Sequence, residues 1–433
     1  MRPLMNSRTR FLRPFLLLLA LVACGPLASP QPTTSPVSTS TPPTPVPSDE
    51  PPTPSLTAEP AEPNTEVAPT PASPQPAAAA HFRAGDPIQL DSITMTGRAE
   101  GWGLSGAYVL TTADGGKTWR ETTPPQGFLP GMENHAYGAF LDAQTAWIVF
   151  AENGLILREA AVWHTMDGGR TWTPGTPLLH EVIGDSVWAE FAVLDARNAW
   201  VMVRGVYVGA GTHYNHELFR TTDGGLTWIS LDGEISNDYT GMVFADTVFG
   251  FRTLETTGAY AAAPPGYDVT TDGGSMWEGR ELPPPPEAPD LFTQLPYCET
   301  YQPVLLTPRS FRMLVGCFDY YDPPRESTSY FYSTQDGGAS WLTVRLPEKT
   351  RAADDRLLWF GLNNALLLGR NMYLSTSDGQ MWSFVKTVNW DGQFSFSDPQ
   401  YGWAVARSNG EVALVQTIDW AATWSLIKPT ITR

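Results

Sequence analysis

Seven aspartates recur along the chain, each in a short stretch that also carries glycine, threonine and tryptophan. The clearest copy runs from Thr221 to Trp228 and reads TTDGGLTW. Repeated carboxylates of this kind could serve as catalytic acids or as calcium ligands. Either chemistry needs further carboxylates at a fixed spacing, and the repeat carries one per copy. The aspartates are Asp114, Asp167, Asp223, Asp272, Asp336, Asp378 and Asp419.

These stretches, called boxes below, are better explained as turns. Asp-Gly favours a tight hairpin because glycine tolerates positive φ and aspartate accepts a backbone N–H within its own turn. The tryptophan that follows can bury against the hairpin or its neighbour. We therefore predict no catalytic residue, metal or cofactor at the boxes. The sixth copy, Thr376 to Trp382, is one residue short, and the seventh, Thr417 to Trp424, lacks both glycines. The tryptophans are Trp119, Trp172, Trp228, Trp277, Trp341, Trp382 and Trp424.

The elements that hold the boxes are short strands. A second pattern, Asp-x-x-x-(Ala/Gly)-aromatic followed by apolar residues, precedes most boxes, as from Asp195 to Trp200. Each unit then reads as four strands, with the box between the third and the fourth. Such units at roughly 40–50 residue intervals predict an all-β, seven-bladed β-propeller with four-stranded antiparallel blades over 82–433. A solenoid or a stacked sandwich is less favoured, because a closed ring leaves only short edges. Residues 87–96 and 426–432 are candidates for closing the ring.

The boxes carry a resemblance to known families. Their pattern resembles the Asp-box, or bacterial neuraminidase repeat. Together with the preceding Asp-x-x-x-Gly-Trp pattern, it looks most like the photosystem II assembly and stability factor propellers and their bacterial relatives. The resemblance covers essentially all of 82–433. It implies that the Asp-box turns are structural and lie on the face opposite any active site.

The other face carries the more varied loops. In units two to five, the segment between the second strand and the box is longer than in the others. Extra length on one side of a ring is commonly functional. We predict that this face binds a ligand through aromatic and carboxylate side chains, although ordinary loop residues would look the same. The candidates are His135, Tyr137, Glu181, Trp188, Glu190, His213, Tyr214 and His216.

Two specific chemistries are weakly supported on that face. His213 and His216 have a spacing compatible with a metal, but the sequence provides no third ligand, so we expect no metal. A sialidase would need an arginine cluster, and the Arg-Ile-Pro motif of that family is absent near the first blade. Carboxylate-pair hydrolysis depends on a separation that the sequence does not provide.

The first eighty residues predict export and attachment. Residues 1–23 have a basic start and an apolar run too short to span a bilayer, which is typical of a signal peptide. Leu21 to Gly25 resembles the lipobox of bacterial lipoproteins, which implies acylation of Cys24. Residues 24–80 are rich in Pro, Thr, Ser and Ala and predict a disordered tether. We therefore expect an extracytoplasmic protein held on the bacterial cell membrane by its N-terminal lipid.

The net charge restricts the classes of partner that the chain could bind. The formal net charge is −18, and removing 1–23, with four arginines and no acids, makes it −22. This argues against nucleic acid as a partner.

Cys298 and Cys317 flank an apparent hairpin that turns at Pro308-Arg309, so they form either a disulfide or two buried thiols.

Three functions remain open. The first is a lipid-anchored binding or scaffold module for a protein or glycan partner. The second is a glycosidase or sialidase-like hydrolase on the same propeller. The third, implied by resemblance alone, is an assembly factor for a membrane complex such as photosystem II.

Overall fold

The computed structural model describes residues 72–125, 134–152, 156, 160–179, 188–207, 214–231, 239–254, 264–295, 297–318, 328–361 and 363–432. For 205–207 and 214–215 it describes the backbone alone. All of these residues belong to one compact unit, Ala68–Arg433. Their regular structure is almost entirely β, and α1 (Leu291–Gln294) is the one helix among them.

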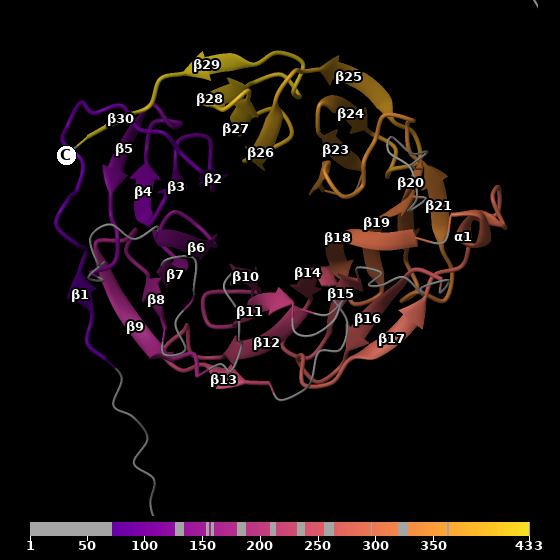
Figure 1. Cartoon of the computed structure of the whole chain (residues 1–433), viewed down its shortest axis with the longest axis horizontal. Coiled ribbons are helices and arrows are strands. Elements are labelled where there is room, and N and C mark those ends of the chain that lie inside the picture. The colour runs from indigo at the N-terminus through magenta and orange to yellow at the C-terminus, as the bar shows by residue number, and fades with distance from the viewer. Residues whose placement is uncertain are drawn as a thin grey trace, which may run out of the picture. The chain divides into compact units, whose positions relative to one another are not determined.

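Seven sheets stand around a central opening as the blades of a propeller (Figure 1). The seven-bladed fold expected from the box count is confirmed. Within each blade, four strands follow one another in sequence order from the axis outward, and neighbours pair antiparallel. Blade 1 holds β2 (Ser92–Met95), β3 (Gly101–Ser105), β4 (Tyr108–Thr112) and β5 (Thr118–Glu121); blade 2 holds β6 (Asn134–Phe140), β7 (Ala146–Glu152), β8 (Ala161–Thr165) and β9 (Thr171–Pro177); blade 3 holds β10 (Trp188–Val193), β11 (Ala199–Tyr207), β12 (Tyr214–Thr221) and β13 (Ile229–Ser230).

The remaining four blades repeat this meander. Blade 4 holds β14 (Tyr239–Phe244), β15 (Gly250–Leu254), β16 (Gly266–Thr270) and β17 (Glu278–Glu281); blade 5 holds β18 (Tyr297–Thr307), β19 (Ser310–Phe318), β20 (Thr328–Thr334) and β21 (Leu342–Arg345); blade 6 holds β22 (Arg356–Phe360), β23 (Asn364–Leu368), β24 (Asn371–Ser375) and β25 (Ser383–Thr387); blade 7 holds β26 (Asp391–Phe396), β27 (Gly402–Ser408), β28 (Glu411–Thr417) and β29 (Ser425–Ile427).

Two added strands fasten the ends of the folded chain to the rim. β30 (Thr430–Ile431) pairs parallel with β5 on the outer edge of blade 1, and Thr430 also bridges to Pro87. β1 (Gln75–Pro76) pairs antiparallel with β9 on the outer edge of blade 2. The ring thus closes when its C-terminal strand joins the first blade (Figure 1). The last residues of the expected tether, including β1, are therefore part of the rim.

Neighbouring blades pack through apolar layers anchored by tryptophan. Trp147, Trp200 and Trp403 open the second strands of their blades and are fully buried. Each indole N–H donates to the carbonyl of the first box glycine in the next blade: Trp147 to Gly224 at 2.9 Å, Trp200 to Gly273 at 2.8 Å and Trp403 to Gly115 at 2.9 Å. At two other boxes, an arginine side chain donates to the equivalent carbonyl. Arg120 donates to the Gly168 carbonyl at 3.1 Å, and Arg280 donates to the Gly337 carbonyl at 3.2 Å. The five boxes with two glycines are thus each fastened to the preceding blade.

Within a box, the aspartate carboxylate is saturated by its own turn. Asp223 Oδ1 accepts the Thr227 N–H at 2.9 Å and the Thr221 hydroxyl at 2.9 Å, and Oδ2 accepts the Thr227 hydroxyl at 2.7 Å. Burial opposes ionisation of Asp223, but these hydrogen bonds outweigh it and lower its pKa. The carboxylate therefore closes a turn.

The sixth box corrects one assignment. Asp378 is not the box aspartate, because the Met381 N–H is accepted by Ser377 Oγ at 2.9 Å and the Gly379 N–H by Ser375 Oγ at 3.1 Å. The box runs from Ser375 to Trp382 without a deletion. Asp378 occupies the first-glycine position at φ +54°, a left-handed conformation that aspartate tolerates better than most residues.

The seventh box keeps its geometry without glycine. Asp419 accepts the Thr423 N–H at 2.8 Å and the Thr423 hydroxyl at 2.6 Å, as Asp223 does with Thr227. Trp420 and Ala421 stand in the glycine positions at φ +62° and +65°. The hydrogen bonds of the turn hold both residues in a conformation that L-residues rarely adopt.

Cys298 and Cys317 form a disulfide, the first of the two alternatives. They lie directly opposite each other on β18 and β19. Both are buried. The bridge ties the innermost strand of blade 5 to its neighbour.

Candidate functional site

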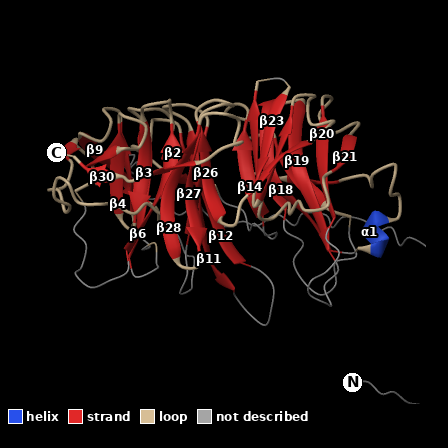
Figure 2. Cartoon of the chain, turned by 90° about the horizontal axis from the view of Figure 1, so that it is seen from above, coloured by secondary structure: helices blue, strands red, loops and turns tan. Residues whose placement is uncertain are grey.

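The ring has two unlike faces. The turns between first and second strands and the boxes between third and fourth strands share one face, called the box face below. The other connections share the opposite face, called the loop face, where α1 also lies (Figure 2). Of the candidate ligand residues, Glu181 and His213 lie outside the described residues. Tyr214 is described by its backbone alone, in β12.

The other five candidates are divided between two blade interfaces. His135 and Tyr137 lie on β6, and Tyr137 packs against the apolar layer between blades 2 and 3. Trp188 and Glu190 lie on the same side of β10 as Ala192, which belongs to the layer between blades 3 and 4. The five described candidates therefore do not gather in one site, because Tyr137 packs toward the layer between blades 2 and 3, and Trp188 and Glu190 lie on the side of β10 that faces blade 4.

A polar row crosses blade 3 near the loop face. Trp188, Arg204 and His216 pair across β10, β11 and β12. The guanidinium carbon of Arg204 lies 4.3 Å from the Trp188 ring centre, and the His216 ring lies 5.1 Å from that of Tyr239 in blade 4. His216 is 5% exposed, so it packs between the blades rather than facing a ligand.

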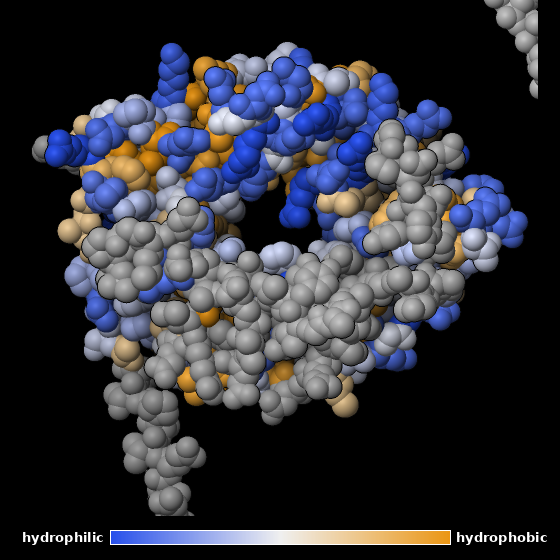
Figure 3. Space-filling view, in the orientation of Figure 1, coloured by the Kyte–Doolittle hydropathy of each residue, from blue (hydrophilic) through white to orange (hydrophobic). Residues whose placement is uncertain are grey.

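Glu190 belongs to the same side of blade 3. Burial raises the pKa of its carboxyl, and the positive charges of Arg356 and Arg204 offset part of this rise. Arg356 begins β22, the innermost strand of blade 6. In Figure 3, hydrophilic residues border the central opening at its upper right.

A cleft lies on the loop face of blades 5 to 7. Its volume is about 1380 Å³. One wall is α1 with its flanking residues, another is the connection 346–355 between β21 and β22, and the third is formed by the starts of β24 and β26. The residues that line it include Ala288, Leu291, Leu295, Tyr330, Arg345, Glu348, Lys349, Arg351, Asp354, Asp355, Arg370, Asn371, Asp391 and Phe394.

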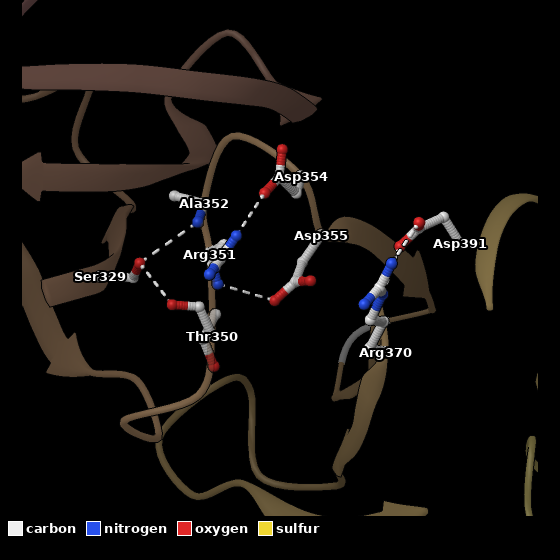
Figure 4. Close-up of polar contacts among 8 residues, drawn as sticks. All are labelled: Ser329, Thr350, Arg351, Ala352, Asp354, Asp355, Arg370 and Asp391. Carbon is white, nitrogen blue, oxygen red and sulfur yellow. Dashed lines mark hydrogen bonds and ion pairs between the residues drawn. The ribbon is translucent and has the colours of Figure 1, made fainter. Parts of the chain in front are cut away.

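The connection 346–355 is held to blade 5 by Ser329. Ser329 Oγ donates to the Thr350 carbonyl and accepts the Ala352 N–H, both at 3.2 Å (Figure 4). Asp355 Oδ2 accepts the Arg351 N–H at 2.9 Å and closes the turn that follows. These contacts give the cleft a fixed wall.

Asp355 is the most perturbed carboxyl group of the cleft. Burial raises its pKa to about 6; the Arg351 N–H opposes this rise, and the charge of Asp354 adds to it. Asp355 is 5% exposed, and it packs so close to Gly369 that a Cβ there would collide with its carboxylate. A carboxyl with this pKa could transfer protons near neutral pH, but its main contact is structural.

Two ion pairs lie on the rim of the cleft. Arg370, beside β24, contacts Asp391 of β26 through two hydrogen bonds of 2.7 Å, which join blades 6 and 7 (Figure 4). Arg351 and Asp354 lie 3.6 Å apart. Hydrogen bonding to Arg370 lowers the pKa of Asp391. The rim therefore presents both signs of charge side by side.

The sequence-based prediction placed the site on the loop face of blades 2 to 5, and the cleft lies on the loop face of blades 5 to 7. The length of the loop between second strand and box favoured blades 2 to 5, whereas the cleft is built largely from connections between blades. The signal that could have revealed it is the segment 282–296, which carries α1, together with 346–355. Both separate a fourth strand from the next first strand.

Neither a metal cluster nor a membrane-spanning helix is found within the described ranges. No group of three or more His, Cys, Asp or Glu residues there could hold a metal ion. No helix in that part of the chain is long and apolar enough to cross a bilayer.

Fold and cleft together define a seven-bladed β-propeller with a polar cleft on its loop face. No protein-family model matches the chain. A xyloglucanase from Paenibacillus sp is 26% identical over 170 residues, which is 35% of this chain and 16% of that protein.

Solved propellers resemble the chain in fold alone. The structure "YCF48 bound to D1 peptide" is 19% identical, covers 79% of this chain and 99% of its own, and has a TM-score of 0.49. YCF48 from Cyanidioschyzon merolae is 14% identical over 77% of this chain and 99% of its own, with a TM-score of 0.45. The GH74 enzyme of Niastella koreensis is 11% identical over 78% of this chain and 62% of its own, with a TM-score of 0.33.

Proposed function

We propose that the protein is a binding module that holds a segment of a protein partner in the cleft of blades 5 to 7. The observation that carries this is the lining of the cleft. Charged side chains of both signs surround an apolar wall made by Ala288, Leu291 and Leu295. A peptide offers donors, acceptors and apolar side chains together, so it can match such a lining.

A glycan is the less favoured ligand. Sugar sites usually present flat aromatic platforms. The lining of this cleft includes two aromatic residues, Tyr330 and Phe394, and many more charged ones. A role in assembling a membrane complex, which the family resemblance implies, is one form that protein binding could take.

Hydrolysis is the second candidate, and Asp355 favours it. Its pKa of about 6 suits a group that donates a proton near neutral pH. The hydrogen bond from Arg351 and the tight packing against Gly369 give Asp355 a structural role as well. Removal of the carboxyl by Asp355→Asn would abolish a hydrolytic activity, whereas a binding module would retain its ligand.

We also propose that the protein works outside the cytoplasm on a lipid anchor at Cys24. The order of basic residues, apolar run and lipobox-like residues in 1–25 supports this. The disulfide between Cys298 and Cys317 supports it independently, because such bonds persist in oxidising compartments. Metabolic labelling with an alkyne fatty acid should label the chain, and Cys24→Ser should abolish the label.

Site-specific crosslinking tests the cleft. A photoreactive amino acid is placed at Asn371 in the cleft or at Met276, which is 74% exposed on the box face. Both variants are irradiated in membrane extracts and in parallel on a glycan array. We expect a discrete protein adduct at Asn371 and none at Met276. Equal adducts at both positions, or capture of glycans alone, would contradict the proposal.

A further inference from the structure

Extended strands fill three of the seams between blades. A seam here is the groove between the outer strand of one blade and the box of the next. In each filled seam, a backbone N–H donates to the carbonyl of the residue after the second box glycine. Added strands fill two of them: the Thr430 N–H of β30 donates to the Lys117 carbonyl at 3.1 Å, and the Ala77 N–H, just after β1, donates to the Arg170 carbonyl at 3.1 Å. The third is closed by the end of β9, itself the outer strand of blade 2, whose Thr176 N–H donates to the Leu226 carbonyl at 3.0 Å.

Filling a seam covers its box tryptophan. Ala77 packs against the layer that contains Trp172, and Trp172 is fully buried. The Trp172 indole N–H donates to the Thr122 carbonyl at 2.8 Å. In the same way, Ile431 of β30 packs in one layer with the fully buried Trp119. The rim of the propeller is thus a surface that accepts an added strand, in either direction (Figure 1).

The seam between blades 5 and 6 has the same parts but no added strand among the described residues. It is a groove of about 330 Å³ between the end of β21 and the sixth box. Trp382, the counterpart of Trp172, is only partly buried there, whereas Trp119, Trp172 and Trp228 in the filled seams are buried. The lining residues are Val344, Arg345, Leu346, Pro347, Glu348, Gln380 and Trp382.

We infer that this groove binds an extended peptide segment of a partner protein, laid along the sixth box as β1 and its following residues lie along the second. The peptide donates a backbone N–H to the Gln380 carbonyl, which corresponds to the Arg170 carbonyl. It covers Trp382 and packs against Val344. The added strand is a known mode of recognition in which the backbone contributes affinity and side chains contribute selectivity.

The three filled seams define the chemistry of the peptide. The donating residue follows proline or glycine in every case: Pro76-Ala77, Pro429-Thr430 and Gly175-Thr176. Proline favours an extended backbone and has no N–H to leave unsatisfied. Gly175 lies against Trp228 and the Gly225 carbonyl, where a Cβ would collide. The groove therefore selects an extended segment in which proline or glycine precedes a small or β-branched residue.

This inference is separate from the cleft. The groove and the cleft share the wall 345–348, but Val344 and Gln380 line the groove alone, and Arg370 and Asn371 line the cleft alone. Substitutions at these positions distinguish failure of one proposal from failure of the other.

A peptide copied from the chain's own rim segment is the probe. Residues 72–82, ASPQPAAAAHF, are synthesised with a fluorescent label and titrated into the full chain, with binding followed by fluorescence anisotropy. We expect saturable binding below about 1 mM, the range of weak peptide recognition. Replacing Ala77→Pro in the peptide removes the donated N–H and should weaken binding about fivefold or more. The control Ala79→Pro alters a residue without a described hydrogen bond and should bind like the parent.

The position of the peptide is tested independently. A photoreactive group on the peptide should crosslink to 344–348 or 380–382, as mapped by mass spectrometry. Val344→Arg should abolish the adduct, and Asn371→Trp in the cleft should leave it unchanged. No saturation at 1 mM, equal binding of the Ala77→Pro peptide, or adducts at other seams would overturn the inference. Self-association of the chain that Val344→Arg abolishes would assign the groove to a second copy and overturn the partner assignment.

Discussion

Arg312 of blade 5 and Asp378 of the sixth box form an ion pair across the interface between blades 5 and 6. The Arg312 side chain is 3% exposed, and its guanidinium carbon lies 4.1 Å from the Trp359 ring centre. In five other boxes the same position is a glycine whose carbonyl accepts a side chain of the preceding blade. The sixth box thus replaces a backbone acceptor with a carboxylate, and the preceding blade provides a buried cation.

Asp378→Gly should therefore destabilise the protein although it restores the usual box residue. Relief of the positive φ contributes about 1 kcal/mol, but the unpaired charge of Arg312 costs about 3–5 kcal/mol. We expect a net loss of about 3 kcal/mol in the free energy of unfolding, measured by denaturant titration. The double variant Arg312→Met/Asp378→Gly should recover most of it. A stabilised single variant would contradict the role of the ion pair.

Box aspartates should contribute more to stability where their carboxylates accept several hydrogen bonds. Asp223→Ala removes an acceptor of three hydrogen bonds from Thr221 and Thr227 and should cost about 3 kcal/mol of unfolding free energy. Ser377→Ala in the sixth box removes a hydroxyl that accepts one backbone N–H and should cost about 1 kcal/mol. An unchanged free energy of unfolding for Ser377→Ala, in thermal and chemical unfolding, would show that Ser377 does not occupy the aspartate position.

Stability should fall in mild acid because of His164. This residue is 6% exposed, stacks on Trp147 with ring centres 5.1 Å apart, and has no described hydrogen bond at Nε2. Burial lowers its pKa from 6.5 to about 4, and the charge of Asp223 opposes that shift in part. Between these values the unfolded chain binds a proton that the native chain does not. The stability that comes from keeping His164 neutral is therefore fully present above about pH 6.5. About 3 kcal/mol of the free energy of unfolding is lost as the pH falls toward 4.

His164→Phe tests this dependence. The ring can still stack on Trp147, but the titrating group is absent, so the free energy of unfolding should change less between pH 6.5 and 4. His135→Phe, at an exposed position on β6, is the control and should retain the wild-type slope. If both variants and the parent share one pH profile, His164 is not the cause.

Reduction should weaken blade 5. The disulfide joins residues 19 positions apart, and a loop of this size stabilises a fold by about 3 kcal/mol. We expect Cys298→Ala/Cys317→Ala to lose about that much in denaturant titration and to become insensitive to reductant. Free thiols in the native parent, detected by alkylation and mass spectrometry, would contradict the bond.

Most of the fold could be predicted because its signals are local. The Asp-Gly-Gly turn, the tryptophan after it and the alternation of apolar residues each depend on a few neighbouring residues, as Thr221 to Trp228 illustrates. The number of repeats then predicted the number of blades. The predicted register of the sixth box was wrong because the sequence allows either Asp378 or Ser377 in the aspartate position. Only the hydrogen bonds of the Met381 and Gly379 N–H groups distinguish the two.

The site depends on contacts that no local pattern encodes. The cleft brings 288–295, 345–355 and 369–371 beside Asp391, and the open seam places Val344 beside Trp382. Each belongs to a different strand or connection, so their proximity follows from how the blades pack around the ring. The candidate residues on β6 and β10 were separated for the same reason, since Tyr137 packs against the layer between blades 2 and 3, whereas Trp188 lies on the same side of β10 as Ala192 in the layer between blades 3 and 4.

The sequence by itself thus determined the repeating unit, the number of blades and the structural role of the boxes, because turn chemistry and strand alternation are properties of short segments. Only the tertiary structure decided which seams are filled, where the cleft lies and that Arg312 requires Asp378. Those features arise when segments far apart in the chain become neighbours, and blade packing alone selects the partners that meet.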